Sequence, residues 1–175
     1  MAYICGGSRG FADLVGLAGA GNLLPIGIHE FDFLYGQTYT LWDDNHEAPG
    51  SFGWLDWNGP PLGTSELADS ILHPENSGYW EIGDLIPAKT GVAVGAPVRS
   101  ALDTWIGRHV TVPVYDQVSY QGANVLFRVS GFAEFVLTGY NFHGGNKTVT
   151  GHFIRWVRPG PGGGTRGVRV IRITN

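Results

Sequence analysis

The sequence predicts a mainly β protein, built as an antiparallel β sandwich or a partly open barrel with two short helices. The 175 residues include 28 glycines and 10 prolines, which limit long helices, and aromatic residues make up 13% of the chain. Three long runs rich in Val, Ile, Phe, Tyr and Thr occupy residues 110–120, 125–141 and 147–158, and short turns containing Gly and Asn separate them. Such runs are typical of a meander of antiparallel strands.

Shorter extended segments flank this meander. Residues 24–29 form the first apolar run, residues 37–42 are rich in strand-forming types, and residues 51–57 carry alternating aromatic side chains. Residues 82–89 indicate an extended connection. Residues 168–174 alternate imperfectly between aliphatic side chains and arginine, which predicts a strand at a sheet edge because charged side chains discourage unwanted pairing there.

Two short helices are predicted between the strands. The first covers residues 63–73, where Thr64 or Ser65 can cap the first turn and Pro74 follows the last. The second covers residues 97–106, with a proline at its first position and Gly107 after its last residue as a C-cap.

One domain is expected from the length and from the lack of an evident linker. We expect residues 1–22 to be an N-terminal arm, flexible or ordered by a partner, and residues 23–175 to form a single β domain. No transmembrane helix is predicted, because the apolar stretch 12–29 is interrupted by an aspartate, four glycines and a proline. The single cysteine, Cys5, excludes an intrachain disulfide.

Charge is distributed unevenly along the chain. Residues 10–88 contain twelve carboxylates and no Lys or Arg, whereas six basic residues and no carboxylate side chain follow Glu134. Either the two halves pair as neighbouring strands and neutralise each other, or subunits associate acidic face to basic face. Binding to nucleic acid is not expected, since the basic residues are few beside a larger acidic surface.

The candidate site residues are the oxygen-bearing side chains Asp43, Asp44, Asp56 and Asn58. Asp and Asn residues close together before a glycine can turn several oxygens toward one hard cation, so calcium is the candidate cofactor. Solvated turns use the same residues for local hydrogen bonds, so a turn without metal is the alternative. A further hypothesis is a hydrolase with a carboxylate pair such as Asp43 and Asp56, which requires the two groups to face each other across a cleft.

No catalytic residue is predicted otherwise. The six histidines, expected at the surface or at strand ends, are scattered without the spacing of a zinc helix, and no nucleophile-elbow or phosphate-binding motif occurs. The six tryptophans would form a platform for sugars or a protein partner if several were exposed, but we expect most of them to pack in the core.

Several short motifs occur in a fixed order along residues 23–174. The motifs are LPIGI at 24–28, GWLD at 53–56, ELA at 66–68, GD at 83–84, KTG at 89–91, VPVY at 112–115, GFA at 131–133 and GHF at 151–153. In this order and spacing the chain resembles the soluble region of TadE/TadG-like Flp pilus-assembly proteins. The resemblance implies an envelope-exposed β domain that a transmembrane segment normally tethers and that takes part in pilus assembly or adhesion.

These observations together predict a non-enzymatic structural or interaction domain, extracellular or at the cell surface, that is related to pilus assembly or is a self-assembling filament subunit. The expected partners are proteins, either further copies of the chain or pilus components, and a membrane only through a tether that is not present in this chain. The alternative is a calcium- or carbohydrate-dependent surface adhesin.

Overall fold

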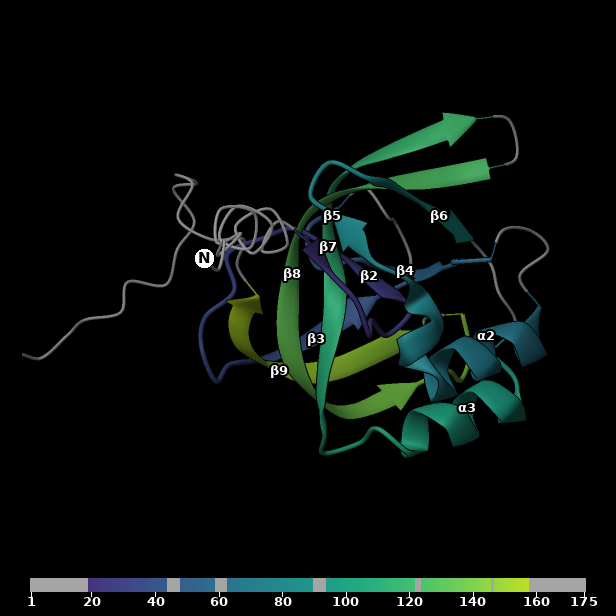
Figure 1. Ribbon diagram of the computed structural model, residues 1–175. Coiled ribbons are helices and arrows are strands. Elements are labelled where there is room, and N and C mark those ends of the chain that lie inside the picture. The colour runs from purple at the N-terminus through teal and green to yellow at the C-terminus, as the bar shows by residue number, and fades with distance from the viewer. Residues whose placement is uncertain are drawn as a thin grey trace, which may run out of the picture.

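The computed structural model describes residues 19–43, 48–58, 63–89, 94–121, 124–145 and 147–157. Within these ranges the protein is mainly β with two α-helices, which confirms the predicted class (Figure 1). The strands are β1 (Gly19–Ala20), β2 (Ile26–His29), β3 (Thr38–Trp42), β4 (Phe52–Leu55), β5 (Trp80–Glu81), β6 (Leu85–Lys89), β7 (His109–Gln121), β8 (Asn124–Asn141) and β9 (Thr148–Val157). The helices are α2 (Thr64–Leu72) and α3 (Ala96–Asp103), and a 3-10 helix, η1 (Pro74–Ser77), follows α2.

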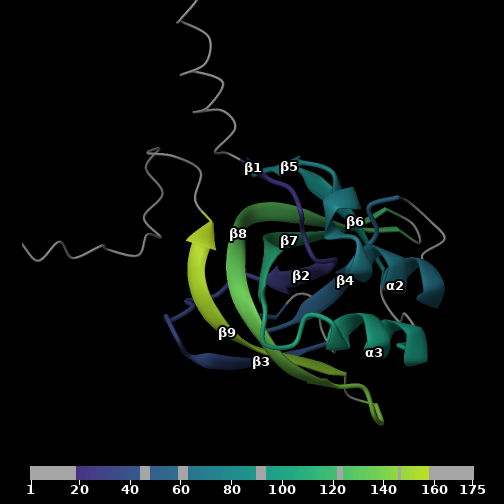
Figure 2. The ribbon, with the colours of Figure 1, turned by 60° about the horizontal axis from the view of Figure 1, so that its bottom comes forward.

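Five strands close into a barrel in the order β8-β6-β4-β2-β7, because β7 also pairs with β8. The sequence predicted a sandwich or a partly open barrel. Strand β8 is 18 residues long, so its two ends can pair with different strands. Residues 125–128 pair with β6 inside the barrel, and residues 132–141 pair with β9 outside it. Strand β3 then pairs with β9 and is the last strand of this sheet (Figure 2).

Two pairings in the barrel differ from the prediction. Strand β2 runs parallel to β7, with Ile28 beside Val114, where only antiparallel pairing was expected. Strand β6 lies between β8 and β4, where an extended connection was expected. Pro87 weakened the strand signal, because proline is rare in central strands. Here Pro87 lies opposite Leu126, and its carbonyl accepts a hydrogen bond from the main-chain N–H of Asp56 at 2.9 Å.

Helix α2 begins one residue later than predicted. Gly63 is its N-cap residue, so the prediction that Thr64 or Ser65 takes this position is wrong. The extended backbone of Gly63 takes the cap position, and its carbonyl accepts a hydrogen bond from the N–H of Leu67 at 2.9 Å.

Helix α3 ends at Asp103, three residues before its predicted end. The main-chain N–H groups of Thr104 and Trp105 donate to the carbonyls three residues back, those of Ala101 at 3.2 Å and Leu102 at 2.8 Å, so tighter 3-10 turns follow the α-helix at this point. Gly107 is therefore not the C-cap. It adopts a φ of +77° in the turn toward β7, and its N–H donates to the Leu137 carbonyl at 2.7 Å.

In the part of the chain that the structure describes, two clusters of buried side chains form the core. The larger cluster joins the helices to the sheet and contains Phe52 and Trp54 of β4 with Leu67 and Ile71 of α2. The second cluster contains Leu55 at the end of β4, together with aromatic and aliphatic residues of β6, β7 and β8. All four residues of β4 are buried, because β4 contributes side chains to both clusters.

A bulge in β7 connects the two clusters. Asp116 on β7 and Ser130 on β8 have no partner in the register between the strands. The extra residues let consecutive side chains of β7 be buried, Val114 in the larger cluster and Tyr115 in the second. Asp116 is partly exposed, and its carboxylate accepts hydrogen bonds from Arg128 Nε at 2.9 Å and Nη2 at 2.6 Å.

The predicted strand at 168–174, Cys5 and residues 1–18 of the predicted arm lie outside the described residues. Residues 19 and 20, at the end of that arm, form β1 and pair with β5 in a separate two-stranded sheet.

Candidate functional site

The structure separates the predicted calcium ligands that it describes. Trp42 bridges to Ser51, so Asp43 lies near the start of β4, whereas Asp56 follows its end and is buried. The five residue-to-residue steps of extended chain from Ser51 to Asp56 span about 16 Å. Asn58 is exposed, and Asp44 lies outside the described residues. No group of three metal-ligating side chains occurs in the described ranges, and calcium binding stays a prediction.

The tryptophans of the described chain are mainly buried or half-buried, as the sequence predicted. Trp54 is fully buried, whereas Trp42 at the end of β3 is 43% exposed. Trp57, Trp80, Trp105 and Trp156 pack partly buried against the two core clusters. The described part of the chain therefore shows no exposed row of tryptophans of the kind that a sugar platform would need.

A different pair of apolar side chains is exposed, at the turn between β2 and β3. Leu34 is 61% exposed and Tyr35 is 78% exposed. The N–H of Gln37 donates to the Leu34 carbonyl at 3.1 Å, and Gly36 has a φ of +70°, which a turn of this kind assigns to glycine. In Figure 2 the segment that leads from β2 into β3 lies at the edge of the molecule, beside β9.

This turn, residues 34–37, is held firmly against the sheet. The N–H of Leu34 donates to the Tyr39 hydroxyl at 2.7 Å, and the N–H of Gly36 donates to the Phe153 carbonyl at 2.8 Å. Phe33, the residue before the turn, is buried and stacks on Phe153 with ring centroids 5.2 Å apart. The two exposed side chains are thus presented by an ordered turn, and an ordered surface loses little conformational entropy when a partner binds.

A polar cluster of three side chains lies across β7, β8 and β9. Glu134 accepts hydrogen bonds from His109 Nδ1 through one carboxylate oxygen and from Arg155 Nε through the other. The Glu134 side chain is 13% exposed, whereas the His109 and Arg155 side chains are mainly exposed. Burial alone would raise the pKa of Glu134, but the bonds from His109 and Arg155 outweigh it and hold this pKa below its ordinary value.

The Glu134 cluster predicts a pH-dependent contribution to stability. A carboxyl group whose pKa is lowered by folding stabilises the fold above its unfolded pKa of 4.5, and this contribution is lost as the pH falls through the folded value. Glu134→Gln should lower the free energy of unfolding by about 1 kcal/mol at pH 7, because both partners are largely solvated. Urea denaturation at several pH values should show this difference shrinking below about pH 4. Glu81→Gln, at an exposed residue, is the control; equal effects of both variants at pH 7 would contradict the role of Glu134.

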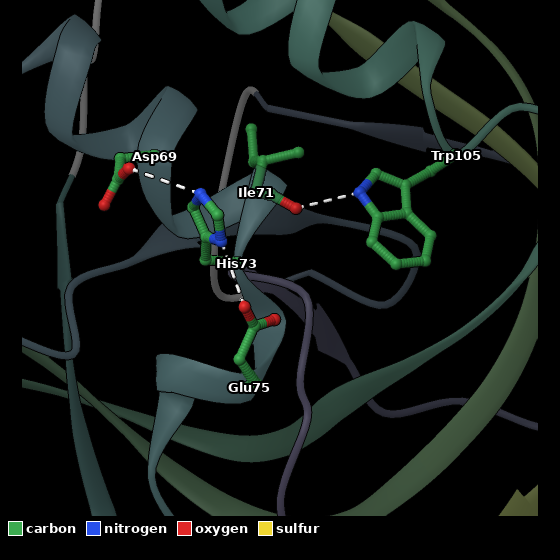
Figure 3. Close-up of polar contacts among 5 residues, drawn as sticks. All are labelled: Asp69, Ile71, His73, Glu75 and Trp105. Atoms are coloured by element: carbon green, nitrogen blue, oxygen red, sulfur yellow. Dashed lines mark hydrogen bonds and ion pairs between the residues drawn. The ribbon is translucent and has the colours of Figure 1, made fainter.

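A second polar group marks the end of α2 (Figure 3). His73 Nδ1 lies 3.0 Å from Glu75 Oε1, and His73 Nε2 lies 3.9 Å from Asp69 Oδ1. The hydrogen bond to Glu75, with the charges of Glu75 and Asp69, raises the pKa of His73. Trp105 Nε1 donates to the Ile71 carbonyl at 2.8 Å and links α3 to α2. The two exposed ion pairs of His73 lie at the C-terminal end of α2, where a protonated histidine is favourable because it interacts with the helix dipole. They fit a structural role.

Two ion pairs bear on the uneven charge of the sequence. Arg128–Asp116 and Arg155–Glu134 both join residues of the C-terminal half. The two halves do meet as neighbouring strands, since β3 pairs with β9, β6 with β8 and β2 with β7. This strand pairing agrees with the interpretation that the acidic and basic halves lie side by side in one fold. The two ion pairs, however, neutralise Arg128 and Arg155 with carboxylates of the same half.

The chain matches no family model, no curated protein and no solved structure. Within the described ranges, no helix has the length and apolar character that crossing a membrane requires.

The sequence interpretation missed the exposed pair Leu34 and Tyr35. A signal was present, because Phe31, Phe33 and Tyr39 surround a Tyr-Gly turn with aromatic anchors, while turns are usually polar. Apolar residues in the first two positions of a turn whose third position is glycine lie outside the strands, and this position indicates that their side chains are exposed.

Proposed function

We propose that this chain is a non-enzymatic interaction domain that acts outside the cytoplasm or at the cell surface, in pilus-related assembly or as a subunit that assembles with its own copies. Its resemblance to TadE/TadG-like proteins supports the location and the assembly role. The partner is a protein surface in each case.

The observation that carries this proposal is the exposed pair Leu34 and Tyr35 on the anchored turn. Energetic contacts at protein interfaces concentrate in a few large side chains, with tyrosine among the most frequent. Leu34 and Tyr35 offer two such exposed side chains on a turn whose backbone is held by hydrogen bonds. One apolar crevice of the described chain, lined by Ile26, Val112 and Leu137, holds about 10 Å³, room for about one water molecule, so this crevice is too small for a substrate.

Sedimentation velocity over a concentration series tests the proposal. The wild-type protein should associate as its concentration rises, and electron microscopy of the concentrated sample should show assemblies. Leu34→Ser with Tyr35→Ser should weaken association at least about tenfold, the equivalent of 1.4 kcal/mol. The melting temperature should stay unchanged, because both side chains are already exposed. Leu72→Ser, at an exposed position on α2, is the matched control. Particles that remain monomeric at the highest concentration would count against self-assembly.

A calcium- or carbohydrate-dependent adhesin is the second candidate, favoured by the half-exposed Trp42 immediately before Asp43. Thermal melts of the same samples with calcium and with a glycan panel separate the two candidates. A ligand that binds only the folded state must raise the melting temperature. A rise with calcium or a sugar in the wild type that Trp42→Ala abolishes would favour the adhesin.

A further inference from the structure

The end of β7 leaves one strand edge open. Residues 117–121 of β7 pair with residues 124–128 of β8 on one side. On the other side β2 reaches only as far as Tyr115, and no strand of the described chain continues along residues 117–121. In Figure 1 this end of β7 is the uppermost strand, with β8 between it and β6.

The main-chain groups of this segment are directed at the open edge in a defined pattern. Earlier in β7 the carbonyls of Thr111 and Tyr115 point toward β2, since they accept hydrogen bonds from the N–H groups of Leu24 and Glu30 at 2.9 Å and 2.8 Å. The bulge at Asp116 adds one residue and reverses this alternation. The N–H and C=O groups of Val118 and Tyr120 therefore face the open edge.

The side chains along this edge are complementary to themselves. The segment reads Gln-Val-Ser-Tyr-Gln, and in an antiparallel pair with its own copy, centred on Ser119, each glutamine lies opposite a glutamine. Val118 of one copy then lies opposite Tyr120 of the other, a β-branched and aromatic pair that stabilises sheets. Val118 already packs against the second core cluster, and Tyr120 is 58% exposed, so pairing would extend this cluster across two molecules.

Nothing in the segment guards the edge. Natural sheet edges are commonly protected by lysine, proline or inward-pointing charges, and residues 117–121 contain none of these. The nearest charge, Asp116, is held by Arg128 through two hydrogen bonds, so two copies would meet without unbalanced like charges.

We propose that a second copy of this chain pairs with residues 117–121 across a twofold axis at Ser119, which joins two barrels through an antiparallel pair of β7 strands. The inference rests on the proposed interaction function and deepens it by naming one partner and its contact. A twofold contact uses the same surface on both molecules, so it closes a dimer and leaves the turn at 34–37 free for a second contact.

Cysteine cross-linking tests the axis directly. Cys5→Ser removes the only native thiol, and Ser119→Cys then places two thiols opposite each other at a non-hydrogen-bonded pair, where Cα atoms are about 4.5 Å apart and a disulfide can form. Mild oxidation should convert most of the protein to a covalent dimer. Gln117→Cys is the matched control on the same edge, because its own copy would lie about 13 Å away along the strand and should not cross-link.

Further variants separate this inference from the proposed function. Tyr120→Lys introduces the charge that the edge lacks, and should weaken dimerisation at least about tenfold without loss of the folded circular dichroism spectrum. If Ser119→Cys cross-links no better than Gln117→Cys while association still depends on Leu34 and Tyr35, the twofold edge contact is wrong and the interaction function stands. If Ser119→Cys cross-links and the turn variant associates normally, the edge contact stands and the role of the turn is wrong.

Discussion

Replacing Trp54 by alanine is expected to lower the free energy of unfolding by about 3–5 kcal/mol, the range observed when a large aromatic side chain is removed from a core. Trp54 is fully buried in β4, and its ring lies 5.4 Å from that of Phe52 and 6.0 Å from that of Phe142. It belongs to the cluster that joins α2 and α3 to the sheet. Because rigid strands surround the site, the cavity cannot collapse fully. Urea denaturation followed by circular dichroism measures the loss.

Two further variants sharpen this test. Trp42→Ala removes the same side chain from a position that is 43% exposed, and should cost less than about 1 kcal/mol. Trp54→Phe should cost less than Trp54→Ala, since the indole N–H of Trp54 has no hydrogen-bond partner in the described part of the chain. Equal losses for Trp54→Ala and Trp42→Ala would mean that the larger cluster does not hold the helices to the barrel.

The meander could be predicted because its strands carry their own signal. β7, β8 and β9 are long, rich in β-branched and aromatic residues, and consecutive in the chain, so local pattern and tertiary pairing agree. The closed ring could not be predicted in the same way. It depends on β6, a five-residue strand containing Pro87, and on the parallel pairing of β2 with β7 between segments far apart in the sequence.

The candidate site was harder to predict than the fold. Oxygen-rich residues such as Asp43 and Asp56 attract attention in a sequence, yet only tertiary structure decides whether they meet, and here β4 separates them. The only sequence signal for the exposure of Leu34 and Tyr35 is indirect, the aromatic residues around the turn, because the exposure depends on how Phe33 and Tyr39 pack in the folded chain. Likewise, the open edge of β7 follows from where β2 ends.

Replacing Gly151 by valine has the second largest expected effect, a loss of about 1–3 kcal/mol, because it adds volume where the structure has no room. A Cβ atom at Gly151 would lie 2.9 Å from the main-chain oxygen of Val136 in the paired strand β8. The neighbouring apolar crevice, which Gly151 lines, cannot relieve this contact, since the Cβ atom itself meets a main-chain oxygen that hydrogen-bonded strands hold in place.

Gly139→Val provides the matched control for this substitution. Gly139 lies in β8 opposite Thr150, beside Gly151 in the β8–β9 pairing, and a Cβ atom there meets nothing within 4 Å. Valine favours strands over glycine, so Gly139→Val should be neutral or stabilising by a few tenths of a kcal/mol, and its melting temperature should equal or exceed that of the wild type. A Gly151→Val protein as stable as the wild type would require β9 to shift away from β8, and would contradict the register that places Gly151 opposite Leu137.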